Sequence, residues 1–131
     1  MSVIFKIFRW PILVLALHIL ATITGSYWYW LRLDNFMHVL GGASIAAASL
    51  SAYPILKQKK FAEIRHPLLL IFLVVAVVAL AAMLWEFMEL GVDTVFEANM
   101  QPDLLDTISD MALGLLGGVM VATKRVMKAS V

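Results

Sequence analysis

Four long apolar runs constrain the fold of this chain more than any other feature of its sequence. They cover about residues 7–31, 34–53, 67–90 and 103–122. An α-helix rises about 1.5 Å per residue, so about 20 residues cross the hydrocarbon core of a bilayer. Because backbone polar groups cannot stay unpaired in that core, each run should be a helix. The sequence therefore predicts an all-α polytopic membrane protein, a single domain over residues 1–131 that forms a four-transmembrane-helix bundle.

The composition supports this class of protein and excludes some chemistry. Hydrophobic residues make up 63% of the chain and charged residues only 15%, whereas about a quarter of a soluble domain is charged. The absence of cysteine excludes disulfide and thiolate chemistry. Lys6 and Arg9 precede an apolar stretch that starts at Trp10, as in a signal peptide, but no good small-residue cleavage site follows. We expect this run to be a transmembrane helix that ends in an interfacial belt of aromatic residues at 27–30.

The distribution of basic residues predicts the orientation of the bundle. Nine of the ten Lys and Arg residues lie in the N-terminal tail, between the second and third runs, or in the C-terminal tail. They are Lys6, Arg9, Lys57, Lys59, Lys60, Arg65, Lys124, Arg125 and Lys128. An even number of spans places these three segments on one side, and cytoplasmic segments are enriched in Lys and Arg. We therefore expect a protein of the cytoplasmic (inner) membrane with both termini in the cytoplasm.

The acidic residues gather at the opposite ends of the predicted helices. Of the nine Asp and Glu residues, only Glu63 lies among the basic segments. The others are Asp34, Glu86, Glu89, Asp93, Glu97, Asp103, Asp106 and Asp110. His38 and Glu86 lie about 6 Å from the helix ends and Asp110 about 10 Å, each on a face shared with Gly or Ala. Because membrane helices approach closely at small residues, we expect these three side chains to face one another inside the bundle.

Several of these residues also have ordinary structural interpretations. Asp34 and Asp103 are suitable N-caps for the second and fourth runs, and Asp106 would suit the positive end of a helix dipole. Glu89, Asp93 and Glu97 could be solvated at a helix end, and His18 could be a packed or hydrogen-bonded histidine in mid-helix. The glycines of the last run are better explained by helix packing than by a phosphate loop, since no GxxxxGK[ST] pattern is present. Glu86, Asp110 and His38 lie too deep to cap any helix.

A histidine and several carboxylates in one small volume require protons or a cation to offset their repulsion. Carboxylate and imidazole ligands suit Mg²⁺, Mn²⁺, Fe²⁺ or Zn²⁺. One such ion could activate water or hold a phosphate, and Arg32 could pair with an anionic headgroup of the substrate. The candidate metal ligands are Asp34, His38, Glu86, Glu89, Asp106 and Asp110. Without a metal, the same residues could relay protons, because histidine titrates near neutral pH.

Three spaced motifs carry a resemblance to a known family. They are Asp34-Asn35-x-x-His38, Trp85-Glu86-x-x-Glu89, and Asp106-Thr107-x-x-Asp110 followed by Gly114 and Gly117. In this order they resemble the small integral membrane family of YjdF over about residues 33–118, and they are more remotely similar to VanZ-like proteins. VanZ-like proteins have Lys, Gln and Asn in place of Asn35, Glu89 and Asp110. These differences favour the resemblance to the YjdF family and disfavour a role in glycopeptide resistance. The resemblance implies a polytopic membrane protein of the cell envelope and supplies no reaction.

Two hypotheses of different class follow from these observations. The first is a metal-dependent enzyme that acts on a lipid-linked or envelope substrate. The second is a non-catalytic membrane protein, in which the polar residues form a proton or cation transport site or a structural network. In both, the lipid bilayer is the surrounding partner and a homo-oligomer is compatible with the sequence. No nucleic-acid partner is indicated, and no catalytic residue is singled out.

The predicted orientation can be tested with reporters fused after Val131. Because nine of the ten basic residues share one side, a C-terminal green fluorescent protein should fluoresce and a C-terminal alkaline phosphatase should be inactive. A fusion that is active only outside the cytoplasm would contradict this orientation.

Overall fold

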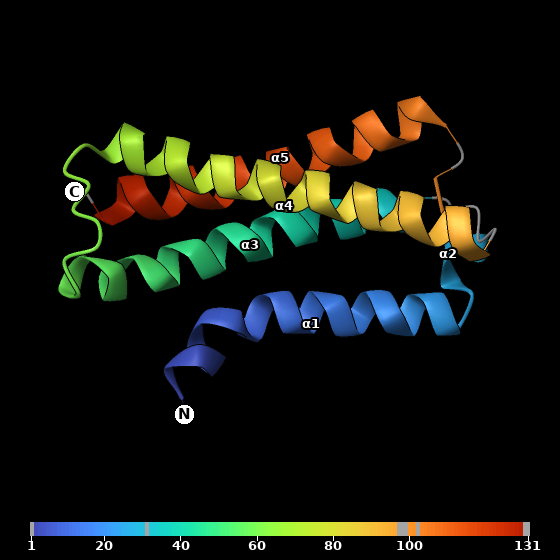
Figure 1. The fold of residues 1–131 in the computed structure, drawn as a ribbon, viewed down its shortest axis with the longest axis horizontal. Coiled ribbons are helices and arrows are strands. Elements are labelled where there is room, and N and C mark those ends of the chain that lie inside the picture. The colour runs from blue at the N-terminus through green and yellow to red at the C-terminus, as the bar shows by residue number, and fades with distance from the viewer. Residues whose placement is uncertain (1, 31, 97–99, 102, 130–131) are drawn as a thin grey trace.

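The computed structural model describes residues 2–30, 32–96, 100–101 and 103–129, which form only helices and their connections (Figure 1). The helices are α1 (Val3–Ile23), α2 (Ser26–Tyr29), α3 (Leu33–Gln58), α4 (Pro67–Phe96) and α5 (Leu104–Ala129). Helices α1, α3, α4 and α5 are long and apolar enough to cross a membrane. The prediction of an all-α bundle of four membrane helices is therefore confirmed.

The two ends of the bundle differ in charge. Both chain termini lie at one end, together with the α3–α4 connection (Figure 1). This is the end that carries the nine basic residues, and we call it the basic end. The α1–α3 and α4–α5 connections lie at the other, acidic end. Most positive and most negative side chains therefore lie at opposite ends of the bundle axis.

Helices α3, α4 and α5 form the packed part of the bundle. Helix α5 packs against both α3 and α4, and its contact with α3 is the most extensive. A small apolar core joins the three helices through Ala46, Val74, Val78 and Ala122. Helix α1 packs against α3 but makes no close backbone contact with α4 or α5 in the described residues. It therefore lies at the edge of a three-helix unit.

Glycine allows α3 and α5 to approach closely. A Cβ atom added at Gly42 of α3 would overlap the carbonyl oxygen of Gly114, and one added at Gly117 of α5 would overlap that of Val39. The two backbones are therefore in direct contact over this stretch, which is typical of small residues at membrane helix interfaces. The contact confirms that these glycines serve packing. It also sets the distance between the acidic ends of α3 and α5.

The first helix ends earlier than the predicted range of residues 7–31. It stops at Ile23, and the predicted end at residue 31 lies outside the described residues. The break follows from Gly25, whose φ of 66° is left-handed and begins a turn into α2. Thr24 closes α1, because its backbone N–H and its hydroxyl both donate to the Leu20 carbonyl.

The other three helices extend beyond the predicted apolar runs of 34–53, 67–90 and 103–122. Helix α3 continues through Pro54 to Gln58, α4 reaches Phe96, and α5 reaches Ala129. Hydropathy marks only the apolar part of a helix, whereas backbone hydrogen bonding continues into the polar ends. Basic residues such as Lys128 in the last turn of α5 also favour its negative C-terminal end.

The glycine contact generates a stability prediction with a control on the same helix. Gly42→Ala and Gly117→Ala should each destabilise the protein by about 1–3 kcal/mol, because the added methyl group forces two backbones apart. Gly41→Ala should have a much smaller effect, because a Cβ at Gly41 meets nothing within 4 Å. The thermal unfolding midpoint in detergent measures this. Equal midpoints for Gly42→Ala and Gly41→Ala would contradict the proposed packing of α3 on α5.

Candidate metal centre at the acidic end

Five ionisable side chains from three helices converge near the acidic end, and we call them the acidic cluster. They are Asp34 and His38 from α3, Glu86 and Glu89 from α4, and Asp110 from α5. Glu86, Glu89 and Asp110 are 3%, 4% and 3% exposed, and the side chain of His38 is 9% exposed. The side chain of Asp34 is 37% exposed, so the cluster is open on one side. The structure thus brings together five of the six residues predicted as metal ligands.

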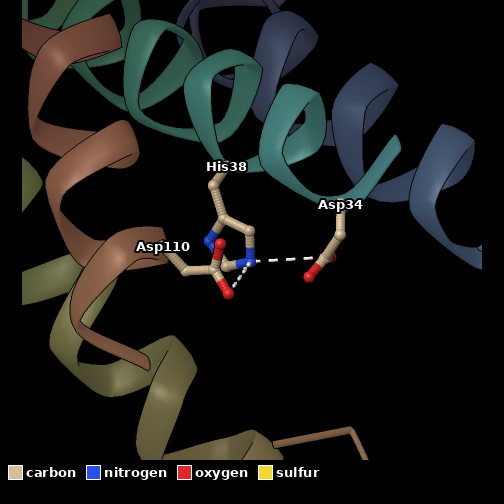
Figure 2. A group of neighbouring side chains, drawn as sticks. All are labelled: Asp34, His38 and Asp110. Atoms are coloured by element: carbon tan, nitrogen blue, oxygen red, sulfur yellow. Dashed lines mark ion pairs between the residues drawn. The ribbon is translucent and has the colours of Figure 1, made fainter. Parts of the chain in front are cut away.

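His38 lies at the centre of the acidic cluster. Its Nε2 atom is 3.6 Å from Asp34 Oδ1 and 3.6 Å from Asp110 Oδ2 (Figure 2). These separations exceed the range of hydrogen bonds, about 2.7–3.2 Å. They are close to the separation of about 3.4 Å expected for two ligand atoms that each lie about 2.1 Å from one tetrahedral cation. The spacing on this side of the imidazole therefore suits a shared metal ion better than a direct hydrogen bond.

The other imidazole nitrogen faces a buried carboxylate. His38 Nδ1 is 3.9 Å from Glu86 Oε1, which is buried and has no hydrogen-bond partner among the described residues. The second oxygen, Glu86 Oε2, accepts a hydrogen bond of 2.8 Å from the Gln101 side chain. A buried carboxylate oxygen without a partner is costly. This oxygen is therefore incompletely satisfied by the protein groups around it.

Glu89 is held at the edge of the acidic cluster by its own helix. Trp85 Nε1, one turn earlier on α4, donates a hydrogen bond of 2.8 Å to Glu89 Oε1. The ligand atoms of His38, Glu86 and Glu89 lie within 4.8 Å of one another, as do those of Asp34, His38 and Asp110. His38 belongs to both groups. The side chains could therefore bind a cation at either nitrogen of the imidazole ring.

The two remaining predicted site residues, Asp106 and Arg32, lie at the ends of α5 and α3 that face the acidic end of the bundle. Asp106 is half-buried in the first turn of α5, close enough to interact electrostatically with Asp34 and His38. It is not part of either group of close ligand atoms in the described residues. Arg32 is exposed directly before α3 and forms no ion pair with a described residue. Neither residue touches His38 in the way that Asp34 and Asp110 do.

The structure decides between several capping and binding interpretations. Asp103 caps α5, because its Oδ1 accepts a hydrogen bond of 2.9 Å from the Asp106 backbone N–H. Asp34 is not a cap, since it lies within the first turn of α3. Asp93 is more than a solvated helix end, because its carboxylate accepts 2.7 Å hydrogen bonds from the backbone of Met100 and Gln101. Glu97 lies outside the described residues.

His18 is a hydrogen-bonded, packed histidine, as the sequence interpretation suggested. Its Nδ1 is 2.7 Å from the Tyr27 hydroxyl, and its ring meets Trp85 edge-on at 5.0 Å between centroids. Tyr27 lies in α2, outside the membrane helices. Burial raises the pKa of Tyr27 to about 12, and the charges of Asp34 and Glu89 add to the shift. Tyr27 is therefore neutral at physiological pH and ties α2 to α1 beside the cluster.

Sequence reasoning missed the donors that hold the buried carboxylates. Gln101 lies in the α4–α5 connection, and its side-chain amide donates to both the carbonyl and the carboxylate of Glu86. Trp85 was recognised only as part of a motif and not as a donor to Glu89. The four-residue spacing of Trp85 and Glu89 could have revealed the second bond. No local pattern marks the first, because it joins residues 15 positions apart.

Comparison with known proteins gives a family but no characterised relative. No curated protein and no solved structure matches this chain. Residues 3–128 match the family described as "Predicted membrane protein (DUF2238)". This family is the YjdF-like family, so that resemblance is confirmed, whereas the more remote likeness to VanZ-like proteins is not supported. With four membrane helices and a match over nearly its whole length, the chain belongs to the DUF2238 family of predicted membrane proteins.

Proposed function

We propose that the acidic cluster binds one divalent cation and that the chain is a metal-dependent enzyme acting on a lipid-linked or other envelope substrate. The observation that carries this proposal is the position of His38, 3.6 Å from carboxylates of two different helices. The buried Glu86 Oε1, without a hydrogen-bond partner among the described residues, points independently to a missing positive group. Both features lie in one small volume. A bound cation accounts for them together.

The balance of charge supports a cation at this position. The cluster contains four carboxylates, and nine of the ten Lys and Arg residues lie at the other end of the chain's helices. Carboxylates at a poorly hydrated site repel one another unless protons or a cation intervene. Asp34 and Asp110 together would balance the two charges of a divalent ion. A neutral imidazole from His38 would complete a ligand set without adding charge.

We infer that Asp34, His38 Nε2 and Asp110 are the protein ligands. Their ligand atoms form one of the two close groups. The carboxylate oxygens of Asp34 and Asp110 accept no hydrogen bond from a described residue. In the second group, Glu86 and Glu89 already accept hydrogen bonds from Gln101 and Trp85. Three protein ligands leave a fourth position open for water or substrate, as in catalytic zinc sites. Zn²⁺, Mn²⁺, Fe²⁺ and Mg²⁺ all accept such ligands.

Glu86 then has a positioning role. When Nε2 of a histidine binds a metal, the other ring nitrogen carries a proton and usually donates it to a carboxylate or carbonyl. Nδ1 of His38 faces Glu86 Oε1 at 3.9 Å. A shift of about 1 Å would bring this pair to hydrogen-bond distance. The buried oxygen would gain its missing partner, and the imidazole would be fixed toward the cation. Gln101, which holds the other oxygen, would support the same orientation.

The proposed cation and Arg32 together suit an anionic substrate. The bound ion could polarise a phosphoryl or carbonyl oxygen or activate a water molecule. Arg32 is exposed two positions before Asp34 and could pair with a phosphate, which guanidinium groups recognise well. Asp106, which is close enough to Asp34 and His38 to interact electrostatically, could accept a proton from attacking water. With both termini in the cytoplasm, as we propose, the acidic end of the bundle would face the outer side of the inner membrane.

A transport function has less support than a bound metal. Transport of protons or cations requires polar groups along a path through the membrane. Residues 39–56, 67–85 and 111–123 include no Asp, Glu, His, Lys or Arg. Helices α3, α4 and α5 therefore offer no charged or histidine side chain next to the acidic cluster on the way to the basic end. Its concentration at a single depth suits a bound ion or a structural network.

Elemental analysis of the purified protein tests the metal centre. We expect about one divalent ion per chain in the wild type, and loss of that ion in His38→Ala and Asp110→Asn. Glu86→Gln should keep the site but weaken metal affinity by about 10–100-fold, because it alters only the support of the imidazole. Affinity should also fall at acidic pH, since the ligands must be deprotonated. His66→Ala, in the exposed connection at the basic end, is the matched control and should keep the metal.

Thermal unfolding separates a metal from a protonated network. A chelator should lower the unfolding midpoint of the wild type, because the ion binds only the folded state. It should have no effect on His38→Ala. If chelator changes nothing in the wild type and Glu86→Gln is the more stable protein at neutral pH, the carboxyl group holds a proton. The metal proposal would then be wrong and the structural network would stand.

A further inference from the structure

A cavity of about 250 Å³ extends from the acidic cluster along the inside of α1. Apolar and small residues of three helices line most of it, among them Pro11, Leu15, Gly41, Ile45, Ala81 and Trp85. Asp34 and His38 of the acidic cluster line it as well, together with His18 of α1. The cavity therefore joins a polar, metal-binding end to an apolar interior.

The arrangement of the helices explains why this space is not filled. Helix α1 packs on α3 and has no close backbone contact with α4 in the described residues. Gly41 and Gly42 on α3 and Ala81 and Ala82 on α4 contribute little side-chain volume to the lining. A Cβ atom at Gly41 would meet nothing within 4 Å. The cavity is thus a groove between α1 and α4 with α3 as its floor, and it lies at the edge of the packed unit.

We propose that this groove binds one hydrocarbon chain of a membrane phospholipid whose phosphate group lies at the cation and Arg32. The inference rests on the proposed metal centre and names the substrate class for it. The bundle lies in lipid, so lipid chains are the molecules at highest concentration beside an apolar groove at its edge. A lipid bound there would present its headgroup to the acidic cluster.

The length of the groove agrees with a single lipid chain. On α3 its lining runs from Asp34 to Ile45, which is about 16 Å along the helix axis. This is about half of the hydrocarbon core of a bilayer, which is about 30 Å thick. The groove therefore spans the depth of one leaflet, on the side of the acidic cluster. A lipid of that leaflet could enter without crossing the membrane.

The chemistry of the lining also agrees with a hydrocarbon chain. Ser44 is the one polar lining residue between the cluster and the apolar end, and its hydroxyl donates to the Gly41 carbonyl at 2.8 Å. Its hydrogen-bonding capacity is thus used within its own helix. A hydrocarbon chain needs no donors or acceptors from this surface. A phosphate could not approach four carboxylates alone, so its binding depends on the cation and on Arg32.

Quenching of Trp85 fluorescence by brominated lipid chains tests the groove. The full chain carries Trp10→Phe, Trp28→Phe and Trp30→Phe, so that only Trp85, a lining residue, fluoresces. It is placed in phosphatidylcholine nanodiscs with increasing brominated-chain phosphatidic acid or brominated-chain diacylglycerol. We expect saturable quenching by phosphatidic acid at low mole fraction, and quenching proportional to bulk concentration for diacylglycerol.

Two variants locate the binding. Gly41→Leu fills the groove and should abolish the saturable component, whereas Gly91→Leu is the control. The backbone around Gly91 is as open as that around Gly41, and Gly91 does not line the groove. Arg32→Gln should reduce the preference for phosphatidic acid over diacylglycerol. Equal quenching curves for Gly41→Leu and Gly91→Leu would overturn the proposal.

The same preparation, analysed for metal, distinguishes the two proposals. Loss of saturable quenching on addition of chelator supports both. Saturable quenching that is lost in Gly41→Leu, in protein that contains no metal as purified, would contradict the metal centre, and the groove would then bind the lipid chain without a cation. Saturable quenching that persists after a chelator has removed a stoichiometric metal would contradict the placement of the phosphate at the cation. Quenching that is never saturable in protein with stoichiometric metal would contradict the lipid groove and retain the metal centre.

Discussion

The close contact between α3 and α5 is the interaction on which the rest of the structure depends. The backbones meet at Gly42 and Gly114 and again at Gly117 and Val39, where a Cβ atom at Gly42 or Gly117 would overlap the facing carbonyl. His38 lies one turn before Gly42, and Asp110 one turn before Gly114, so the same contact brings imidazole and carboxylate to 3.6 Å. Packing and site chemistry are therefore one arrangement. In a bilayer, where apolar burial gives little drive for association, such close contact is what holds helices together.

The acidic cluster combines groups that are fixed with groups that are not. Glu86 and Glu89 are each held by a donor, Gln101 and Trp85, and these donors come from different parts of the chain. Asp34 and Asp110 face only His38 among the described short contacts. This division suits a site in which one pair of carboxylates supports the imidazole and the other pair meets an ion. The sealed side faces α4, and the open side faces the groove beside α1.

Hydropathy and helical periodicity predict much of this structure because a membrane allows few alternatives. The number of helices follows from run length. The convergence of His38, Glu86 and Asp110 follows from their similar depth on faces rich in small residues. The end of α1 was missed, because one left-handed glycine overrides an apolar run. The bond from Gln101 to Glu86 was missed for another reason. It depends on how a connection folds back over the helices, and no periodic pattern records that path.

The origin of the cluster from three successive helices has a consequence for biosynthesis. Membrane helices emerge from the ribosome in chain order, and α5 supplies Asp110 last. Until then, His38 and Glu86 have an incomplete set of neighbours. Acidic residues within membrane segments are costly and usually face the interior of a bundle. Docking of α5 on α3 completes the cluster, and a chain that stops before α5 lacks the carboxylate of Asp110 that faces His38. The last helix to be made is thus the one that completes both the packing and the polar site.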